Sequence, residues 1–323
     1  ILSLTGETLD SQEETHYILG LLKLGLILPY DVSHTRSAFL HNIHAILWIY
    51  LGSSIVLYER FWDLKHKPFE NTPDPKFLFF SSQHQEALFK LQYAVDEGRG
   101  AAILTGEYGC GKTLLTRVLI KHLDESRYDI GLLTNPRWKS EELLKEILYQ
   151  LGHEVKSTDK AELLHTLNDD VLFKNFQEGR STVIIIDEAQ MITDFDTLEE
   201  LRLLLNFQLD DKFLLTLILS GQPELNTIID NIPQFEQRIA VRHHLTGLNL
   251  EETDEYIKYR LAVAGHEAEV FNADAIHRIF ELTQGTPRKI NNICDICLLV
   301  GFTRKASVID VDIVQGANGA RRP

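Results

Sequence analysis

The sequence predicts an α/β protein whose central strands are parallel and buried on both faces. Three short apolar runs support this prediction, and they occupy residues 101–104, 181–186 and 213–219. The second run, STVIII, is rich in β-branched residues and leads directly into two carboxylates, which is the pattern of a strand in the middle of a parallel sheet. A glycine-rich segment and an apolar helical pattern follow the first run. A fold of alternating strands and helices therefore accounts for this part of the chain.

The length and composition exclude several classes of protein. The 323 residues are enough for about two domains with sizeable cores. With 44% hydrophobic and 24% charged residues, the chain is neither disordered nor collagen-like. The formal net charge of -15 argues against a surface that coats DNA without sequence preference, although a local basic groove stays open as an alternative. The 3 cysteines are too few for a secreted disulfide framework, so we expect a reducing, cytosolic compartment.

Residues 1–57 form a separate apolar extension. Met191 is the only methionine, so Ile1 is not expected to be a natural translation start, and Leu57 fits a misread alternative start codon. Residues 38–58 contain no Asp, Glu, Lys or Arg and are just long enough to cross a bilayer, whereas two histidines and an asparagine within them oppose a span. The alternatives are therefore a membrane-associated segment, a packed helix, and a non-native extension without function.

The strongest motif follows the first apolar run. It has the pattern G-x-x-x-x-G-K-T between a strand and a helix, which is typical of a phosphate-binding loop. Its residues are Gly106, Glu107, Tyr108, Gly109, Cys110, Gly111, Lys112 and Thr113, and the predicted nucleotide contacts extend to Leu114. The glycines allow N–H groups to point at a phosphate, and the helix N-terminus adds its positive dipole end. We expect Lys112 to reach the β- and γ-phosphates and Thr113 to place its hydroxyl on Mg²⁺. Cys110 is interpreted as a small loop residue, because no base lies near it in the sequence.

The other two runs supply the rest of the predicted catalytic site. Asp187, at the end of the second strand, is expected to hold Mg²⁺ mainly through the water shell of the ion. Glu188 follows it and is expected to orient and polarise the attacking water, which predicts hydrolysis. After the third run, Gln222 or Ser220 is placed to sense the γ-phosphate and hold the water. The alternative is that this Ser-Gly-Gln-Pro segment simply forms a turn.

Helices are predicted from apolar spacing and from capping residues. They are expected over residues 140–151, 160–177, 251–265, 273–283 and 288–301, with caps at Ser140, Asp159, Thr253 and Asn272 and with Pro287 opening the last helix. The last three helices make the carboxyl-terminal part mostly helical. Cys294 and Cys297 form a C-x-x-C pattern there, but no second cysteine pair accompanies them, so they are interpreted as small core residues.

The order of several motifs resembles the ExeA-type ATPases, also called general secretion pathway protein A. The matching segments are residues 58–69, 72–78 and 82–88 before the phosphate loop, and residues 187–190, 205–207, 221–225, 237–239 and 285–291 after it. The resemblance spans residues 58–316 of the 323. It implies an AAA+ fold, in which a P-loop NTPase domain of three αβα layers over residues 58–247 precedes a small α-helical lid over residues 248–323.

The same resemblance assigns roles to arginines. Arg238 resembles an arginine finger that reaches the γ-phosphate held by a neighbouring subunit, with Arg242 as the reserve candidate. Arg288 resembles a second sensor that closes over the phosphates of its own subunit. For each, the alternative is an ordinary surface arginine that caps a helix or pairs with a carboxylate. An arginine finger implies a nucleotide-dependent homo-oligomer, for which we expect a ring. The resemblance also suggests that residues 63–75 wrap the nucleotide domain and contribute to the adenine pocket.

The implied function is ATP hydrolysis with Mg²⁺ in support of secretion or export machinery at the cell envelope, as in bacterial type II secretion. The chain would work in the cytoplasm or at the inner face of the inner membrane, beside a membrane-anchored partner. Longer family members continue into a membrane helix and a peptidoglycan-binding domain, and these are not carried over. The competing interpretation is an AAA+ regulator of transposition type, which shares similar D-E-A-Q and G-Q-P-E-L motifs and uses ATP to control filament formation on DNA. The acidic balance favours the secretion type.

Overall fold

The structure is a computed structural model that describes residues 58–72, 75–209 and 212–319. These residues belong to one unit, which spans residues 58–323. The apolar extension over residues 1–57 and its alternative interpretations lie outside the described residues.

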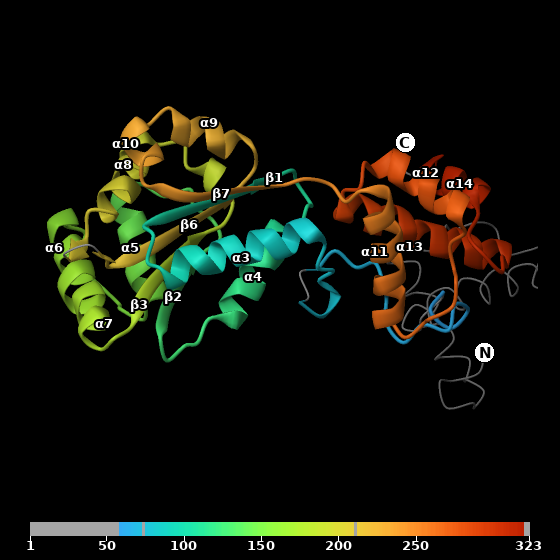
Figure 1. Cartoon of the computed structure of the whole chain (residues 1–323), viewed down its shortest axis with the longest axis horizontal. Helices are drawn as coiled ribbons and strands as arrows, with labels where there is room; N and C mark the ends of the chain where they lie inside the picture. The colour runs from blue at the N-terminus through green and yellow to red at the C-terminus, as the bar shows by residue number, and fades with distance from the viewer. Residues whose placement is uncertain (1–57, 73–74, 210–211, 320–323) are drawn as a thin grey trace, which may run out of the picture. The chain divides into compact units, whose positions relative to one another are not determined.

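A parallel five-stranded sheet organises the first part of this unit (Figure 1). Its strands lie in the order β2-β3-β6-β1-β7, and all four neighbouring pairs are parallel. The strands are β1 (Ala101–Gly106), β2 (Tyr128–Leu133), β3 (Ser181–Ile186), β6 (Leu215–Gly221) and β7 (Ile239–Leu245). Parallel strands present their carboxyl ends at one edge of the sheet, so the loops after β1, β3 and β6 meet there.

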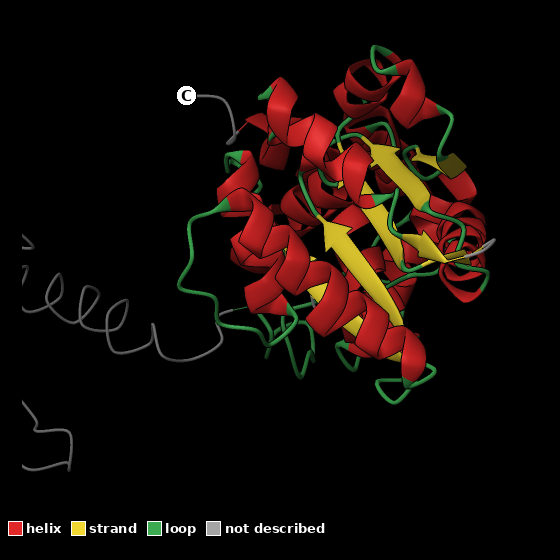
Figure 2. Cartoon of the chain, turned by 90° about the vertical axis from the view of Figure 1, so that its left-hand side faces the viewer, coloured by secondary structure: helices red, strands yellow, loops and turns green. Residues whose placement is uncertain are grey.

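Helices cover both faces of the sheet (Figure 2). On one face, α3 (Ser82–Asp96) and α4 (Lys112–His122) pack with strand side chains into one apolar cluster. The other face carries α5 (Ser140–Gln150), α6 (Lys160–His165), the π-helical η3 (Thr166–Phe173), α7 (Lys174–Gln177), α8 (Phe195–Leu204), α9 (Glu224–Asp230) and α10 (Pro233–Glu236), with a short 3-10 turn, η4 (Ala189–Met191), after β3. The predicted three-layer α/β fold is therefore confirmed.

The alternation of side chains explains why the central strands are apolar throughout. In β1, Ala101 and Ile103 belong to the cluster under α5 and α8, whereas Ala102 and Leu104 belong to the cluster under α3 and α4. All four have no exposed surface. A strand that is covered on both faces has no position where a polar side chain could reach water.

The third strand begins two residues later than the sequence predicts. Lys212–Phe213 form β5, which pairs antiparallel with β4 (Gln208–Leu209) in a separate two-stranded sheet. The ring of Phe213 lies against Gly100, where an added Cβ would be 3.2 Å from the ring. The apolar run over residues 213–219 therefore contains parts of two strands, because its first side chain packs at the amino-terminal edge of the main sheet.

The carboxyl-terminal part is a helical lid, as predicted. Its helices α11 (Leu250–Val263), α12 (Ala273–Thr283), α13 (Pro287–Arg304) and α14 (Val311–Gly319) share one apolar core. Asn272 caps α12, because its side chain accepts a 2.9 Å hydrogen bond from the amide of Ala275. Pro287 opens α13. Both assignments agree with the sequence expectation.

Two predicted caps are wrong. Asn249 caps α11, since its side chain accepts from the amide of Glu252 at 2.8 Å while the Glu252 carboxylate accepts from the amide of Asn249 at 3.1 Å. Thr253 lies inside the helix and donates to the Asn249 carbonyl instead. Ser140 is the first residue of α5, and Lys139 occupies the capping position. A capping residue precedes the first helical residue, so it lies outside the apolar pattern that reveals the helix.

The segment before α3 packs with the lid. Its side chains in the lid core are Tyr58, Trp62, Leu64 and Phe69. The Trp62 indole also donates to the Leu298 carbonyl at 3.0 Å. The expectation that residues 63–75 wrap the nucleotide domain is therefore wrong for the described part of that loop, because its large apolar side chains are buried in the lid. Residues 70–72 do border the nucleotide cavity described below.

The two cysteines of the C-x-x-C pattern lie in the same lid core. Cys294 and Cys297 are both fully buried. Burial raises the pKa of both thiols, that of Cys297 to about 12, so both stay protonated at neutral pH. Their interpretation as core residues is confirmed.

Candidate nucleotide-binding site

The phosphate loop connects β1 to α4, as the motif predicts. Gly109 and Gly111 have φ values of 90° and 97°, a region that side chains disfavour. A Cβ at Gly109 would lie 2.5 Å from the Cβ of Arg288, so the lid touches the loop where no side chain fits. Helix α4 begins at Lys112, and its positive dipole end therefore faces the loop.

Lys112 is held at the loop by backbone carbonyls. Its ammonium donates to the carbonyl of Gly106 at 2.7 Å and to that of Glu107 at 3.2 Å. The residue is only 5% exposed. A buried ammonium that is held by neutral carbonyls attracts an anionic ligand, which is the role predicted for this lysine.

Asp187 brings together the ends of two strands and the start of α4. Its Oδ2 accepts from the Thr113 hydroxyl at 2.6 Å, and its Oδ1 accepts from the Ser220 hydroxyl at 2.8 Å and from the amide of Glu188 at 3.1 Å. A hydroxyl in contact with a carboxylate supplies the hard oxygen ligands that suit Mg²⁺, which usually takes one or two carboxylates and completes its shell with water and phosphate. Thr113 and Asp187 therefore fit the ion that the sequence predicts for them.

Glu188 is held in a fixed orientation by Gln190. Glu188 has a φ of 54°, a conformation that costs free energy for a residue other than glycine and is frequent at functional sites. Its carboxylate accepts from the side-chain amide of Gln190 at 2.6 Å, and the oxygen of that amide accepts from the backbone amide of Gln222 at 3.0 Å. Gln190 thus ties the end of β3 to the end of β6. The γ-phosphate contact of the Gln222 side chain stays a prediction, whereas Ser220 contacts Asp187.

The lid closes one side of a cavity at the loop. The guanidinium of Arg288 lies 4.5 Å from the ring centroid of Tyr108, and the Arg288 amide donates to the Gly109 carbonyl at 3.2 Å. Predicted site residues that line the cavity are Tyr108, Gly109, Gly111, Lys112, Thr113, Leu114, Glu188 and Arg288. Tyr256 and Arg260 line it as well, although the sequence does not mark either as a site residue. Asn71 also lines it and belongs to the segment over residues 63–75 that is expected to contribute to the adenine pocket.

Arg238 lies at the opposite edge of the sheet. It precedes Ile239, which pairs with Ala101 at the start of β1, whereas the phosphate loop follows the other end of that strand. A strand of this length rises roughly 17 Å between its ends. The Arg238 guanidinium donates to the Leu205 carbonyl at 2.7 Å and to the side-chain oxygen of Asn206 at 2.6 Å. The structure therefore does not bring Arg238 to the phosphate loop of its own chain.

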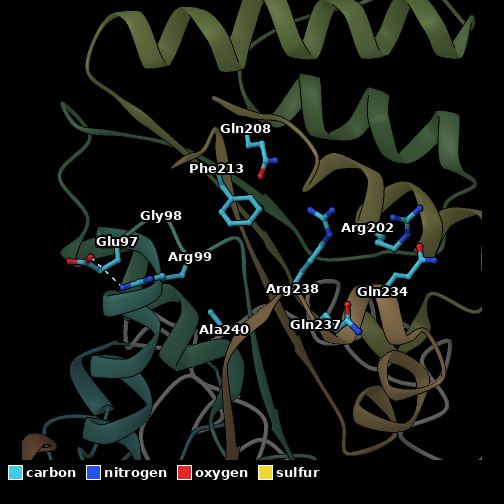
Figure 3. A pocket seen from close by; sticks show the side chains of 10 residues that line it. All are labelled: Glu97, Gly98, Arg99, Arg202, Gln208, Phe213, Gln234, Gln237, Arg238 and Ala240. Carbon is cyan, nitrogen blue, oxygen red and sulfur yellow. Dashed lines mark ion pairs between the residues drawn. The ribbon is translucent and has the colours of Figure 1, made fainter. Parts of the chain in front are cut away.

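A second cavity surrounds Arg238, and it is the larger of the two (Figure 3). Its volume is about 680 Å³, against about 250 Å³ for the cavity at the phosphate loop. Arg99 and Arg202 also line it, and each forms an ion pair with a glutamate. Arg242, the reserve candidate for the finger, pairs with Asp230 at 2.9 Å and is not part of this lining. The smaller cavity is the candidate nucleotide site, because its lining includes the phosphate loop and Glu188, whereas the larger cavity has neither.

Two buried residues behind the loop complete the description. Burial raises the pKa of the Cys110 thiol, so it stays protonated at neutral pH, which agrees with a small loop residue. His84, which the sequence analysis did not single out, contacts the Cys110 carbonyl through its ring at 3.0 Å. Ser81, three residues earlier, caps α3 through its side chain, but this cap alone does not mark His84 as a residue of the site.

Comparison with known proteins identifies an AAA domain in this chain. The family model described as AAA domain matches residues 95–229. General secretion pathway protein A of Aeromonas hydrophila is 38% identical over 252 residues, which cover 77% of this chain and 45% of that protein. Among solved structures, Drosophila ORC bound to DNA matches 94% of this chain and 73% of its own with a TM-score of 0.61 at 15% identity. ORC2 of Aeropyrum pernix matches 79% of this chain and 71% of its own with a TM-score of 0.59 at 18% identity.

The chain contains an AAA domain and has the AAA-type P-loop NTPase fold. Its resemblance to general secretion pathway protein A is confirmed by the identity over most of the chain. The likeness to the ORC structures shows the fold alone, because the identities are 15% and 18%. This chain spans 45% of the length of the secretion pathway relative, which is less than half.

None of the helices in the described part of the chain has the length and apolar character that crossing a membrane requires. The candidate span over residues 38–58 lies outside the described residues except for Tyr58.

Proposed function

We propose that this chain is a Mg²⁺-dependent ATPase that hydrolyses ATP to ADP and phosphate. The observation that carries the proposal is the contact between Thr113 and Asp187, with Lys112 and Glu188 beside the same cavity. A hydroxyl and a carboxylate suit Mg²⁺, a buried ammonium suits a phosphate, and a second carboxylate suits water. Transfer of a phosphoryl group to water needs these three kinds of group within reach of one another.

Each residue has a separate task in this proposal. Lys112 and the N-terminus of α4 bind the β- and γ-phosphates. Thr113 and Asp187 hold Mg²⁺, which when bound neutralises phosphate charge and fixes the orientation of the phosphates. Glu188 orients the attacking water and accepts its proton. Because Gln190 already holds the Glu188 carboxylate, the water-binding group needs little rearrangement when ATP binds.

Full activity in this proposal needs a second subunit. Arg288, which lines the cavity, closes over the phosphates from the lid of the same chain. Gln222 is proposed to sense the γ-phosphate from the end of β6. Arg238 lies at the far edge of the sheet and serves the site of a neighbouring subunit, where its charge stabilises the transition state. We therefore propose a nucleotide-dependent homo-oligomer, closed into a ring in which every Arg238 faces a neighbouring phosphate loop.

The cellular role that we propose is support of secretion or export machinery at the cell envelope. The identity with general secretion pathway protein A supports it. The chain would act in the cytoplasm or at the inner face of the inner membrane, together with a membrane-anchored partner protein. ATP binding and hydrolysis would then switch the oligomer between states that bind this partner differently.

A second candidate function is ATP-dependent DNA binding of the transposition-regulator type. The observation that favours it is the cavity lined by Arg99, Arg202 and Arg238, which gathers three arginines on an acidic chain, although glutamates pair with the first two. Stimulation of ATP hydrolysis by double-stranded DNA, weakening steeply as salt rises, would make this the leading function. A rate that ignores DNA supports the secretion role.

The experiment that tests hydrolysis compares two variants with the wild type. Glu188→Gln should bind ATP with near wild-type affinity and hydrolyse it about 100-fold more slowly, because the amide cannot accept the proton. Lys112→Ala should lose ATP binding. Glu125→Gln removes an exposed carboxylate away from the site and serves as the matched control. Hydrolysis by Glu188→Gln at the wild-type rate, or wild-type hydrolysis that survives removal of Mg²⁺ by EDTA, would contradict the proposal.

A further inference from the structure

His84 is a buried side chain for which the proposed ATPase mechanism gives no role so far. It lies in the first turn of α3 and is 4% exposed. Its Nε2 lies 3.0 Å from the carbonyl oxygen of Cys110, and its Nδ1 lies 2.7 Å from the hydroxyl of Ser81. A carbonyl can only accept, so Nε2 carries the ring proton and Nδ1 accepts the proton of the Ser81 hydroxyl. Burial lowers the pKa of His84, which favours this neutral ring at pH 7.

The contact fixes the peptide unit between Cys110 and Gly111. In a trans peptide the C=O and the following N–H lie in one plane and point in opposite directions. The chain has no cis peptide bond among its described residues. When His84 holds the Cys110 carbonyl on the α3 side, the Gly111 N–H therefore points away from α3, toward the interior of the loop where a phosphate would bind.

The His84 ring also restrains the conformation of the loop at Gly111. A Cβ added at Gly111 would be 3.0 Å from the His84 Nε2, so ring and loop are in close contact. Cys110 itself is 1% exposed, and a buried carbonyl that loses its donor is costly. Gly111 has a φ of 97° and no side chain to restrain it, so the peptide before it could rotate if the ring did not hold it.

We infer that His84 is a positioning residue for nucleotide binding, whose Nε2–H holds the Cys110 carbonyl so that the Gly111 N–H faces the phosphates. This inference rests on the proposed function, because it assigns His84 to the same phosphate loop. His84 touches no reacting atom in it. Its loss should therefore weaken the binding of nucleotide and leave the chemical step at saturating ATP nearly unchanged.

The test compares His84→Phe with His84→Gln. Phenylalanine keeps an aromatic ring of similar size and removes both nitrogens, whereas glutamine places an amide N–H near the position of Nε2. We expect His84→Phe to weaken the binding of Mg·ADP about tenfold, measured by calorimetry, with kcat for ATP within about twofold of the wild type. His84→Gln should bind within about threefold of the wild type. Thermal unfolding without nucleotide checks that both variants are folded.

Several results would overturn the inference. Unchanged binding by His84→Phe would do so, as would equal weakening in both variants, since the ring and not its N–H would then matter. A fall in kcat without a change in affinity would also contradict it. A wild-type chain that binds no nucleotide would instead contradict the proposed function, so the two failures are distinguishable.

A measurement on the wild type keeps the inference testable if His84→Phe does not fold. Two-bond nitrogen–proton NMR spectra report which ring nitrogen carries the proton, and the His84 signal is assigned by its loss in His84→Gln. We expect the Nε2–H tautomer at pH 7. The Nδ1–H tautomer would contradict the inference, because its Nε2 has no proton to donate to the Cys110 carbonyl.

Discussion

The two edges of the sheet differ in how many groups of the proposed active site they carry. At the carboxyl edge, Lys112, Thr113, Asp187 and Glu188 lie close together, and each is held by hydrogen bonds within the chain. At the amino edge, Arg238 is held in place as well, but the described residues near it form no phosphate loop and no carboxylate pair for a metal.

Under the proposed function, this difference would let a single chain carry half of an active site on each edge. Because the strands are parallel, β1 keeps Arg238 roughly 17 Å or more from the phosphate loop of the same chain. Its charge can serve catalysis only if the amino edge of one copy meets the carboxyl edge of another. Such a head-to-tail contact closes into a ring when the rotation between copies allows it.

The largest expected effect comes from removing the arginine at the amino edge. Arg238→Ala should lower ATP hydrolysis per subunit about 1,000-fold at protein concentrations where the wild type is assembled, because the transition state loses a neighbouring charge. ATP affinity of the dilute subunit should stay unchanged. Steady-state rates against protein concentration measure both.

Arg242→Ala is the matched control, because Arg242 lies within β7, the strand that Arg238 immediately precedes, and pairs with Asp230 instead. It should retain the wild-type rate within about threefold, as expected for an exposed ion pair. The opposite pattern, with Arg242→Ala inactive and Arg238→Ala active, would move the finger to Arg242.

A smaller effect is expected from changing Ser220, which contacts Asp187 at the carboxyl edge. Ser220→Ala removes the hydrogen bond to Asp187 and leaves the contact between Asp187 and Thr113. We expect the Mg²⁺ concentration for half-maximal hydrolysis to rise, and the rate to fall about tenfold. The ratio of the wild-type rate to the Ser220→Ala rate should be the same at every protein concentration. If the two rates became equal once the protein assembles, the assignment of Ser220 to the carboxyl edge of its own chain would be contradicted.

How well the sequence predicted these features depends on how local each one is. The phosphate loop and Asp187 follow from short motifs at the ends of apolar runs, and the structure places them in contact. Three features depend on contacts between segments far apart in sequence, and the pattern carries no sign of these. They are the packing of Trp62 in the lid, the bond between Asn206 and Arg238, and the contact of His84 with Cys110.

Errors in element boundaries have a related cause. The apolar run over residues 213–219 looks like one strand, but Phe213 packs against Gly100 and leaves β6 to begin at Leu215. Apolar spacing reports burial and not the element that provides it. The sequence favours Thr253 over Asn249 as a cap for the same reason, since Thr253 lies nearer to the apolar pattern.

The smallest effect is expected from changing Asn206, which contacts Arg238 at the amino edge. Asn206→Ala removes one of the two acceptors that hold Arg238, while the Leu205 carbonyl remains. Hydrolysis by the assembled protein should fall about threefold, with ATP affinity unchanged. Gln208→Ala changes a polar residue that lines the cavity around Arg238, and this variant should stay at the wild-type rate. Equal effects of the two variants would show that the bond to Arg238 has no special role.

The claim that one active site is shared between two chains is tested most directly by mixing two inactive variants. Glu188→Gln lacks the water-orienting carboxylate but keeps Arg238, and Arg238→Ala keeps a complete phosphate loop. In an equal mixture, some intact loops face an intact Arg238, so the account predicts a hydrolysis rate well above the sum of the two separate rates. A mixture that is no faster than that sum, under conditions where the wild type assembles, would contradict the account.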